Sequence, residues 1–326
     1  MDVINVIECG DTLKNTGVCG CFFDPKQIAG FILMPKGFKL AESNLSDDNI
    51  VATFEDAFMA VKADRMYPVM GMVGVTDSSE EPVMQTFGYG KSETVREGLY
   101  NWVMAFRKGG VNLSNSLRSF NGEAASFDVL LVMSDNVLIG TIATNAGTGA
   151  NEMAGIPLDE LYTYPWKLND GTKLAEFRTK ISFEPSYINE QIAIRKVPAN
   201  ILALKTLVGL KDLKVTSGAA ATNTTATIKV ISDCGENLYS RYKTELSGVS
   251  SGVPVAFIFR NKATGSAFTV TSIVGNDGLE AFVVTIPTSS NPNYPTATNA
   301  YTVELVNVAA LDAAGVSGYE GTNILT

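Results

Sequence analysis

Alternation of apolar and polar residues predicts that most of the chain forms β-strands. In the clearest case, residues 175–184, apolar side chains and one threonine take one parity and charged or hydroxyl side chains take the other. Successive side chains of a strand point to opposite faces of a sheet, so this segment predicts a long strand with one buried and one solvated face. Residues 100–106 alternate in the same way and predict a strand with one aromatic face.

Two hairpins follow from the same pattern. Residues 127–133 and 137–141 flank the turn Ser134-Asp135-Asn136. Residues 158–167 lead through Asn169-Asp170-Gly171, a sequence suited to positive backbone φ angles, into the strand at 175–184. Further strands are expected at 65–75, 83–89, 213–216, 225–231, 255–260, 268–274, 281–286 and 301–306.

One prominent helix is expected over residues 47–63. Ser46 is the expected N-cap, and apolar residues recur at helical spacing from Ile50 to Val61. Shorter helices are expected near residues 113–120, 238–246 and 308–314. The predicted fold is therefore mainly β, with sheets that form a sandwich or barrel and one prominent helix.

A change in composition predicts two domains. Residues 216–227 are rich in Ser, Thr, Ala and Gly, and regular short strands follow them. We expect a β-rich assembly domain at 1–205 and a second domain at 206–326, a small α+β or Ig-like sandwich. No repeat of about 20–50 residues is found.

The absence of histidine excludes several kinds of active site. The 326 residues contain no histidine, which excludes a Ser-His-Asp triad, a Cys-His pair and a histidine metal site.

The net charge is −9 without a basic stripe, which argues against tight nonspecific nucleic-acid binding but not against a conduit past which DNA slides. Charged residues are only 18% of the chain, as in a protein whose surface is partly covered by neighbours, although a Ser/Thr-rich β domain explains this equally well.

The cysteines and the apolar segments predict neither metal nor membrane. Cys9, Cys19, Cys21 and Cys234 offer one short pair and no histidine to complete a zinc site, so we expect free thiols and no metal or cofactor. The first residues lack the regions of a signal peptide, and no apolar run reaches membrane-spanning length. We therefore expect synthesis in a cytoplasm and no membrane partner.

Two sets of side chains are candidate functional residues. Glu176, Arg178, Lys180 and Glu184 share the solvated parity of the strand at 175–184 and form a candidate interface or lumen face. Tyr162, Tyr164 and Trp166 form a second set, expected to pack opposite Phe177 and Phe183 or against another subunit, with a sugar platform as the alternative.

No catalytic residue is assigned. The neighbouring carboxylate pairs begin at Asp47, Glu55, Glu80 and Asp159. Adjacent residues diverge on both strands and helices, so none of these pairs is aimed at one substrate atom. We expect solvated surface charge and no enzyme activity.

The order of elements resembles that of virion proteins of tailed bacteriophages, and most closely a tail tube (major tail) protein with an Ig-like C-terminal domain. The resemblance spans roughly residues 50–200. It rests on the segments Arg65–Val69, Thr76–Pro82, Gly88–Gly90, Asp135–Thr141, Asn169–Gly171 and Ile181–Phe183.

The resemblance implies a mechanical role in the virion. Tail tube subunits form stacked rings, usually hexameric, in which neighbouring sheets join around a lumen that passes DNA. Long hairpins and loops bridge the stacked rings. The implied partners are copies of this chain, other virion proteins and DNA as nonspecific cargo. In that picture the charged face of 175–184 lines the lumen, and its apolar face packs on the helix at 47–63.

Three other functions remain open on the sequence. A capsid-associated or decoration protein belongs to the same class. A carbohydrate-binding adhesive module would use the aromatic residues. A histidine-free hydrolase would use the carboxylates.

Overall fold

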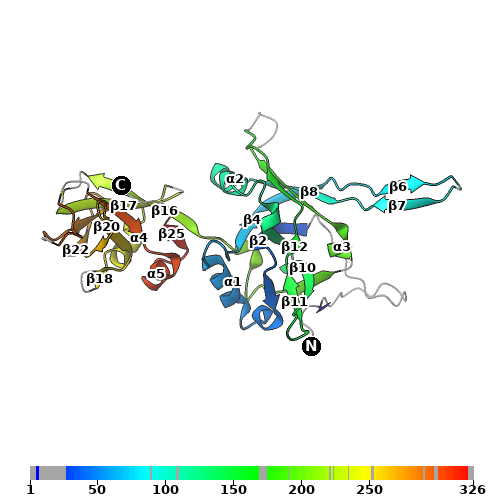
Figure 1. Ribbon diagram of the computed structural model, residues 1–326, viewed down its shortest axis with the longest axis horizontal. Coiled ribbons are helices and arrows are strands. Elements are labelled where there is room, and N and C mark those ends of the chain that lie inside the picture. Colours follow the sequence, from blue (N-terminus) through cyan, green and yellow to red (C-terminus); the bar gives the residue numbers. More distant parts are fainter. Residues whose placement is uncertain are drawn as a thin grey trace. The chain divides into compact units, whose positions relative to one another are not determined.

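The computed structural model describes residues 5–6, 27–88, 90–107, 110–168, 175–189, 191–219, 222, 224–233, 235–250, 253–288, 291–296 and 300–321 (Figure 1). The chain divides into two compact units, Met1–Gly209 and Leu210–Thr326, near the boundary expected after residue 205. Strands dominate both units, which confirms the predicted mainly-β class. The turn Asn169–Gly171 and all four cysteines lie outside the described residues.

Unit 1 is built on a large mixed sheet, here called sheet A. Its main path runs β1–β15–β10–β9–β2–β4, and β3, β11 and β12 extend it. The strands are β1 (Asn5–Val6), β2 (Ile28–Pro35), β3 (Lys39–Ala41), β4 (Tyr67–Met70), β9 (Phe127–Met133), β10 (Val137–Thr144), β11 (Asn151–Ala154), β12 (Ile156–Pro157) and β15 (Ile192–Lys196). The predicted hairpin of residues 127–141 is confirmed as β9–β10.

A second sheet, sheet B, packs on one face of sheet A. Its order is β13 (Glu160–Thr163), β14 (Phe177–Phe183), β8 (Tyr100–Phe106) and β5 (Met72–Asp77), all antiparallel. Trp102, Phe106, Phe177 and Phe183 bury their rings against residues of sheet A such as Phe31. The predicted pairing of 158–167 with 175–184 is confirmed, and β8 and β14 bury the faces expected of them.

The other face of sheet A is covered by α1 (Ile50–Met59) and the short 3₁₀ helices η2 (Glu42–Leu45) and η4 (Leu204–Thr206). Phe54 and Phe58 of α1 pack there. The expectation that β14 packs on this helix is therefore wrong. Sheet A lies between the two elements, because its central strands are apolar on both faces.

The prominent helix is shorter than the predicted span 47–63. Asn49, not Ser46, is its N-cap residue, because the Ser46 hydroxyl donates a hydrogen bond back to the Ser43 carbonyl at 2.8 Å. At the other end Ala60 leaves the helical conformation, and the Arg65 Nε donates to its carbonyl oxygen at 2.9 Å. The Arg65 side chain thus supplies a polar partner of the kind that the last carbonyl groups of a helix require.

The strand expected at 65–75 is divided by Gly71 (φ 84°), so that β4 joins sheet A and β5 joins sheet B. A positive φ is accessible to glycine at little cost.

Beyond β5 the chain continues into a two-stranded hairpin, β6 (Val83–Thr86) and β7 (Ser92–Arg96), here called the arm. Figure 1 shows the arm projecting beyond the other strands of unit 1. The remaining helices of this unit are α2 (Gly110–Arg118), η3 (Ala124–Ser126) and α3 (Pro185–Asn189).

Unit 2 is a small sandwich of two mainly antiparallel sheets. One sheet has the order β22 (Ser272–Asn276), β23 (Ala281–Thr285), β17 (Thr225–Ser232), β16 (Lys211–Ala219) and β25 (Tyr319–Gly321); the other has β21 (Ala267–Phe268), β20 (Phe257–Asn261) and β24 (Tyr301–Leu305). A short pair, β18 (Val249–Ser250) and β19 (Val253–Pro254), and the helices α4 (Tyr239–Leu246) and α5 (Val308–Ala313) complete it.

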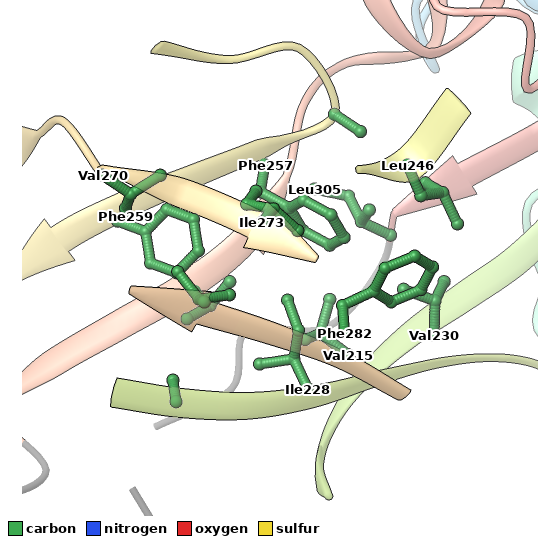
Figure 2. Packing of buried hydrophobic residues seen from close by; sticks show 14 of the residues in the cluster. Val215, Ile228, Val230, Leu246, Phe257, Phe259, Val270, Ile273, Phe282 and Leu305 are labelled. Atoms are coloured by element: carbon green, nitrogen blue, oxygen red, sulfur yellow. The ribbon is translucent and has the colours of Figure 1, made fainter. Parts of the chain in front are cut away.

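The core of unit 2 lies between its two sheets. Phe257 and Phe259 of β20 meet Ile228 and Phe282 of the facing sheet (Figure 2). The strand predicted at 268–274 is divided into β21 and β22, which belong to different sheets. β25, which follows α5 in the chain, pairs parallel with β16.

Candidate functional site

The outer face of sheet B carries most of the candidate residues. Because β14 pairs with β8 and β13 in register, Arg178 and Lys180 point away from the buried rings of Phe177 and Phe183. Tyr162 is the cross-strand neighbour of Lys180, and Tyr164 bonds through its backbone to Arg178 at 2.8 Å. Arg178, Lys180, Tyr162 and Tyr164 thus form one surface, here called the outer face.

Ion pairs within the chain hold the charges of the outer face. Arg178 donates from Nε and Nη2 to Oε1 of Glu176 at 2.9 and 2.7 Å. Lys180 Nζ donates to Oε2 of Glu160 at 2.6 Å. Glu184 is exposed beyond the end of β14. Both pairs are partly exposed to solvent, so each contributes little to stability but fixes the direction of its cation.

The aromatic set divides between the two faces. Tyr162 and Tyr164 are 41% and 37% exposed, and their rings meet edge to face at 5.1 Å. Trp166 instead packs against Phe177, with ring centroids 5.8 Å apart. The expectation that all three pack opposite Phe177 and Phe183 is therefore wrong for the tyrosines. Tyr164 pairs with Arg178 and Lys167 with Glu176, so one strand has an extra residue there, and such a bulge inverts side-chain parity.

The two edges of sheet B differ. At the β13 edge, the Asn121 side chain bonds to both backbone groups of Thr163: Oδ1 accepts from the Thr163 N–H at 2.7 Å, and Nδ2 donates to the Thr163 carbonyl at 3.1 Å. The amide thus takes the place of a peptide group of a neighbouring strand. At the opposite edge, β5 is the last strand of the sheet, and Val73 in it is 50% exposed.

The arm is an exposed surface that sequence reasoning found only in part. Every residue of β6 and β7 is exposed, and Val83, Met84 and Val95 are 49%, 55% and 62% exposed. Backbone hydrogen bonds from Ser78 to Asn101 (2.8 Å) and from Glu80 to Leu99 (3.0 Å) connect the arm to β5 and β8. The extended run from 83 was expected, whereas β7 was missed because Ser92–Arg96 has no apolar parity.

The arm base also explains one glycine. A Cβ atom on Gly98 would lie 2.0 Å from the carbonyl oxygen of Glu80, so only glycine permits the two strands to approach this closely. Arg96 Nη2 donates to Oε2 of Glu80 at 3.0 Å at the same level. The arm therefore leaves unit 1 through a close-packed and ion-paired base.

Several acidic residues of the neighbouring carboxylate pairs have basic partners. Asp47 accepts from Arg195 at 2.8 Å, Glu80 pairs with Arg96, and Glu160 pairs with Lys180. Within the part of the chain that the structure describes, no three Cys, Asp or Glu side chains gather in a metal-binding group. None of the described helices has the length and apolar character needed to cross a bilayer.

A hydrogen-bonded cluster of polar side chains lies at the surface of unit 2. Asp277 Oδ1 accepts from Lys243 Nζ at 2.6 Å and from the Tyr239 hydroxyl at 2.7 Å. The hydrogen bond from Lys243 lowers the pKa of Asp277, and the same bond raises the pKa of Lys243. Partial desolvation, followed by the bond to Asp277, raises the pKa of Tyr239. The cluster joins α4 to the β22–β23 turn.

No family model matches the chain, and neither a curated protein nor a solved structure matches it at a significant level. Function is therefore inferred from the outer face, the two edges of sheet B and the arm.

Proposed function

We propose that the chain is a structural virion protein that assembles with copies of itself into rings or tubes, as the tail tube of a tailed bacteriophage does, and that DNA passes through it as nonspecific cargo. It would be assembled in the host cytoplasm and remain in the virion. In this role the outer face of sheet B meets DNA or a neighbouring subunit, and the arm bridges to another copy.

The exposed arm is the observation that supports this proposal most directly. A two-stranded hairpin is marginally stable by itself in water and becomes stable when it packs against further strands or a helix. Here the exposed side chains include Val83, Met84 and Val95, which gain stability from burial against another surface. Copies of the same chain are the natural partner of a protein with few charges and no assigned reactive site.

Excision of the arm tests the proposal. Residues 81–98 would be replaced by Asn-Gly, a two-residue turn that joins two antiparallel strands, because Glu80 and Leu99 are already hydrogen-bonded. The full chain should form rings or tubes in negative-stain images and sediment as large particles. The excised variant should keep the melting temperature of unit 1 and remain monomeric. A full chain that stays monomeric at every accessible concentration contradicts the proposal.

The exposure of Tyr162 and Tyr164 favours a second candidate function, a carbohydrate-binding adhesive module. Tyr162 is the cross-strand neighbour of Lys180, which is paired with Glu160, and sugars bind to combinations of aromatic and polar groups. A glycan array with the full chain distinguishes the two candidates. Binding that disappears in Tyr162→Ala and Tyr164→Ala, by a chain that stays monomeric, would favour the module.

A further inference from the structure

We propose that Asn121 is a latch on the β13 edge of sheet B, and that the β5 strand of a second copy displaces it when copies join. This inference rests on the proposed self-assembly and specifies the residues through which it occurs. The latch is defined as the two hydrogen bonds between the Asn121 side chain and the backbone of Thr163.

The strand directions of sheet B make β5 and β13 complementary. The four strands β13, β14, β8 and β5 alternate in direction, so β5 and β13 run opposite to each other. A second copy that continues the sheet head to tail therefore brings its β5 antiparallel to β13 of the first. The sheet pattern continues across the junction without any change in fold.

The residues whose backbone N–H and C=O groups point outward also match between the two edges. The Ser78 N–H donates to the Asn101 carbonyl, so the backbone groups of Ser78 point toward the β8 side. Successive residues of an antiparallel strand point their backbone groups to alternate sides, so those of Val75 and Asp77 point away from β8, toward the open edge of the sheet. On β13 the outward groups are those of Thr163, which Asn121 occupies. When Thr163 lies opposite Val75 of the second copy, the Val75 carbonyl accepts from the Thr163 N–H, and the Val75 N–H donates to the Thr163 carbonyl. These two hydrogen bonds replace the two that the Asn121 side chain makes.

The side chains of this register fit. Tyr164 would lie opposite Gly74 of the second copy, and Tyr162 opposite Thr76, all on the outer face. A Cβ built on Gly74 meets no atom within 4 Å, so the glycine leaves open space beside which an exposed tyrosine ring can pack. Aromatic side chains across from edge glycines stabilise sheets in this way. The exposed tyrosines and the bare glycine thus occupy opposite edges of one sheet.

Three variants test the latch. Val75→Pro removes an outward N–H while leaving the β5–β8 hydrogen bonds intact, and Gly74→Val fills the space for Tyr164 without a clash in the monomer. Each should raise the protein concentration needed for assembly by roughly three- to tenfold, the effect of one lost hydrogen bond or contact. Asn121→Ala opens the β13 edge and should speed assembly by roughly the same factor. Asn115→Ala, at an exposed position of α2, is the matched control.

Sedimentation velocity, light scattering and negative-stain imaging of the full chain give the readout, and thermal melts report folding. Normal assembly of the wild type with no change in any variant would overturn the latch while leaving self-assembly standing. Amorphous aggregation of Asn121→Ala in place of ordered particles would also overturn it. Ordered particles of Asn121→Ala at a protein concentration at which the wild type is still monomeric support the latch. If neither assembles, both the latch and the proposed function fail.

Discussion

Oδ1 of Asn136, in the β9–β10 turn, accepts a hydrogen bond from the backbone N–H of Leu204 at 2.8 Å. Its Nδ2 donates to the carbonyl oxygens of Val197 and Leu202, each at 2.7 Å. Asn136 is 8% exposed and has a φ of 68°, a conformation that asparagine tolerates better than most residues. One side chain therefore fastens the segment after β15 to the centre of sheet A.

Asn136→Ala should lower the free energy of unfolding of unit 1 by about 2–4 kcal/mol, because it leaves three backbone groups without their partner and adds strain at positive φ. Urea denaturation followed by the fluorescence of the tryptophans, both in unit 1, measures the loss. Asn136→Gly is the control, since it removes the same bonds without the strain and should lose less. Equal stability of wild type and Asn136→Ala would contradict the assigned role.

Tyr301 predicts an alkaline instability of unit 2. Burial raises its pKa to about 12, and its hydroxyl has no hydrogen-bond partner among the described residues. The folded pKa lies above the ordinary value of about 10, so the stabilisation is complete below pH 10 and is lost as the pH rises toward 12. Thermal melts from pH 8 to pH 12 should show this loss in the wild type.

Tyr301→Phe is the matched variant for this measurement. It removes the ionisable group and the unpartnered hydroxyl while keeping the ring that packs against Phe268. Its stability at neutral pH should equal or exceed that of the wild type. An alkaline loss as large as that of the wild type would show that another group is responsible.

The Asp277 cluster predicts a small acid effect on unit 2. The pKa of Asp277 is lowered, chiefly by its bond from Lys243, so its stabilisation is present above the ordinary carboxylate pKa and is lost as the pH falls through the lower folded value. Asp277→Asn should therefore flatten the decline in melting temperature at acidic pH. The change at neutral pH should be slight, because the group is exposed to solvent. Glu280→Gln, in the same turn, serves as the control.

Charge reversal on the outer face should change assembly more than folding. Lys180→Glu places two carboxylates side by side at Glu160, yet it should cost unit 1 less than about 1 kcal/mol because both groups are partly exposed. The double variant Lys180→Glu/Glu160→Lys restores the pair and separates the local repulsion from the charge of the face. Sedimentation and melting of both variants are compared. Unchanged assembly with a large loss of melting temperature would contradict this prediction.

Strand periodicity predicted the centre of the fold well. The alternation in β8 and β14 identified both strands and their buried faces, because each has one face in the core and one in water. The helical spacing from Ile50 to Phe58 identified α1 but not its partner. An amphipathic pattern specifies that a face is buried without specifying against which sheet it packs.

Other features left weaker signals. β7 has no apolar parity because both of its faces are exposed. The inward direction of Trp166, opposite to that of Tyr162 and Tyr164, depends on a bulge between Tyr164 and Lys167, which alternation alone does not reveal. The contact of Asn121 with Thr163 joins residues 42 positions apart, and local sequence patterns do not report contacts at such a separation.

The continuity of β4 and β5 through Gly71 has a mechanical consequence. One uninterrupted piece of backbone belongs to sheet A on one side of the glycine and leads through β5 to the arm on the other. Tension on the tip of the arm runs parallel to β5 and β8, whose hydrogen bonds lie across that direction and bear the load together in shear. The pull then reaches sheet A through a covalent link, so the arm can resist traction without peeling away from the body that carries it.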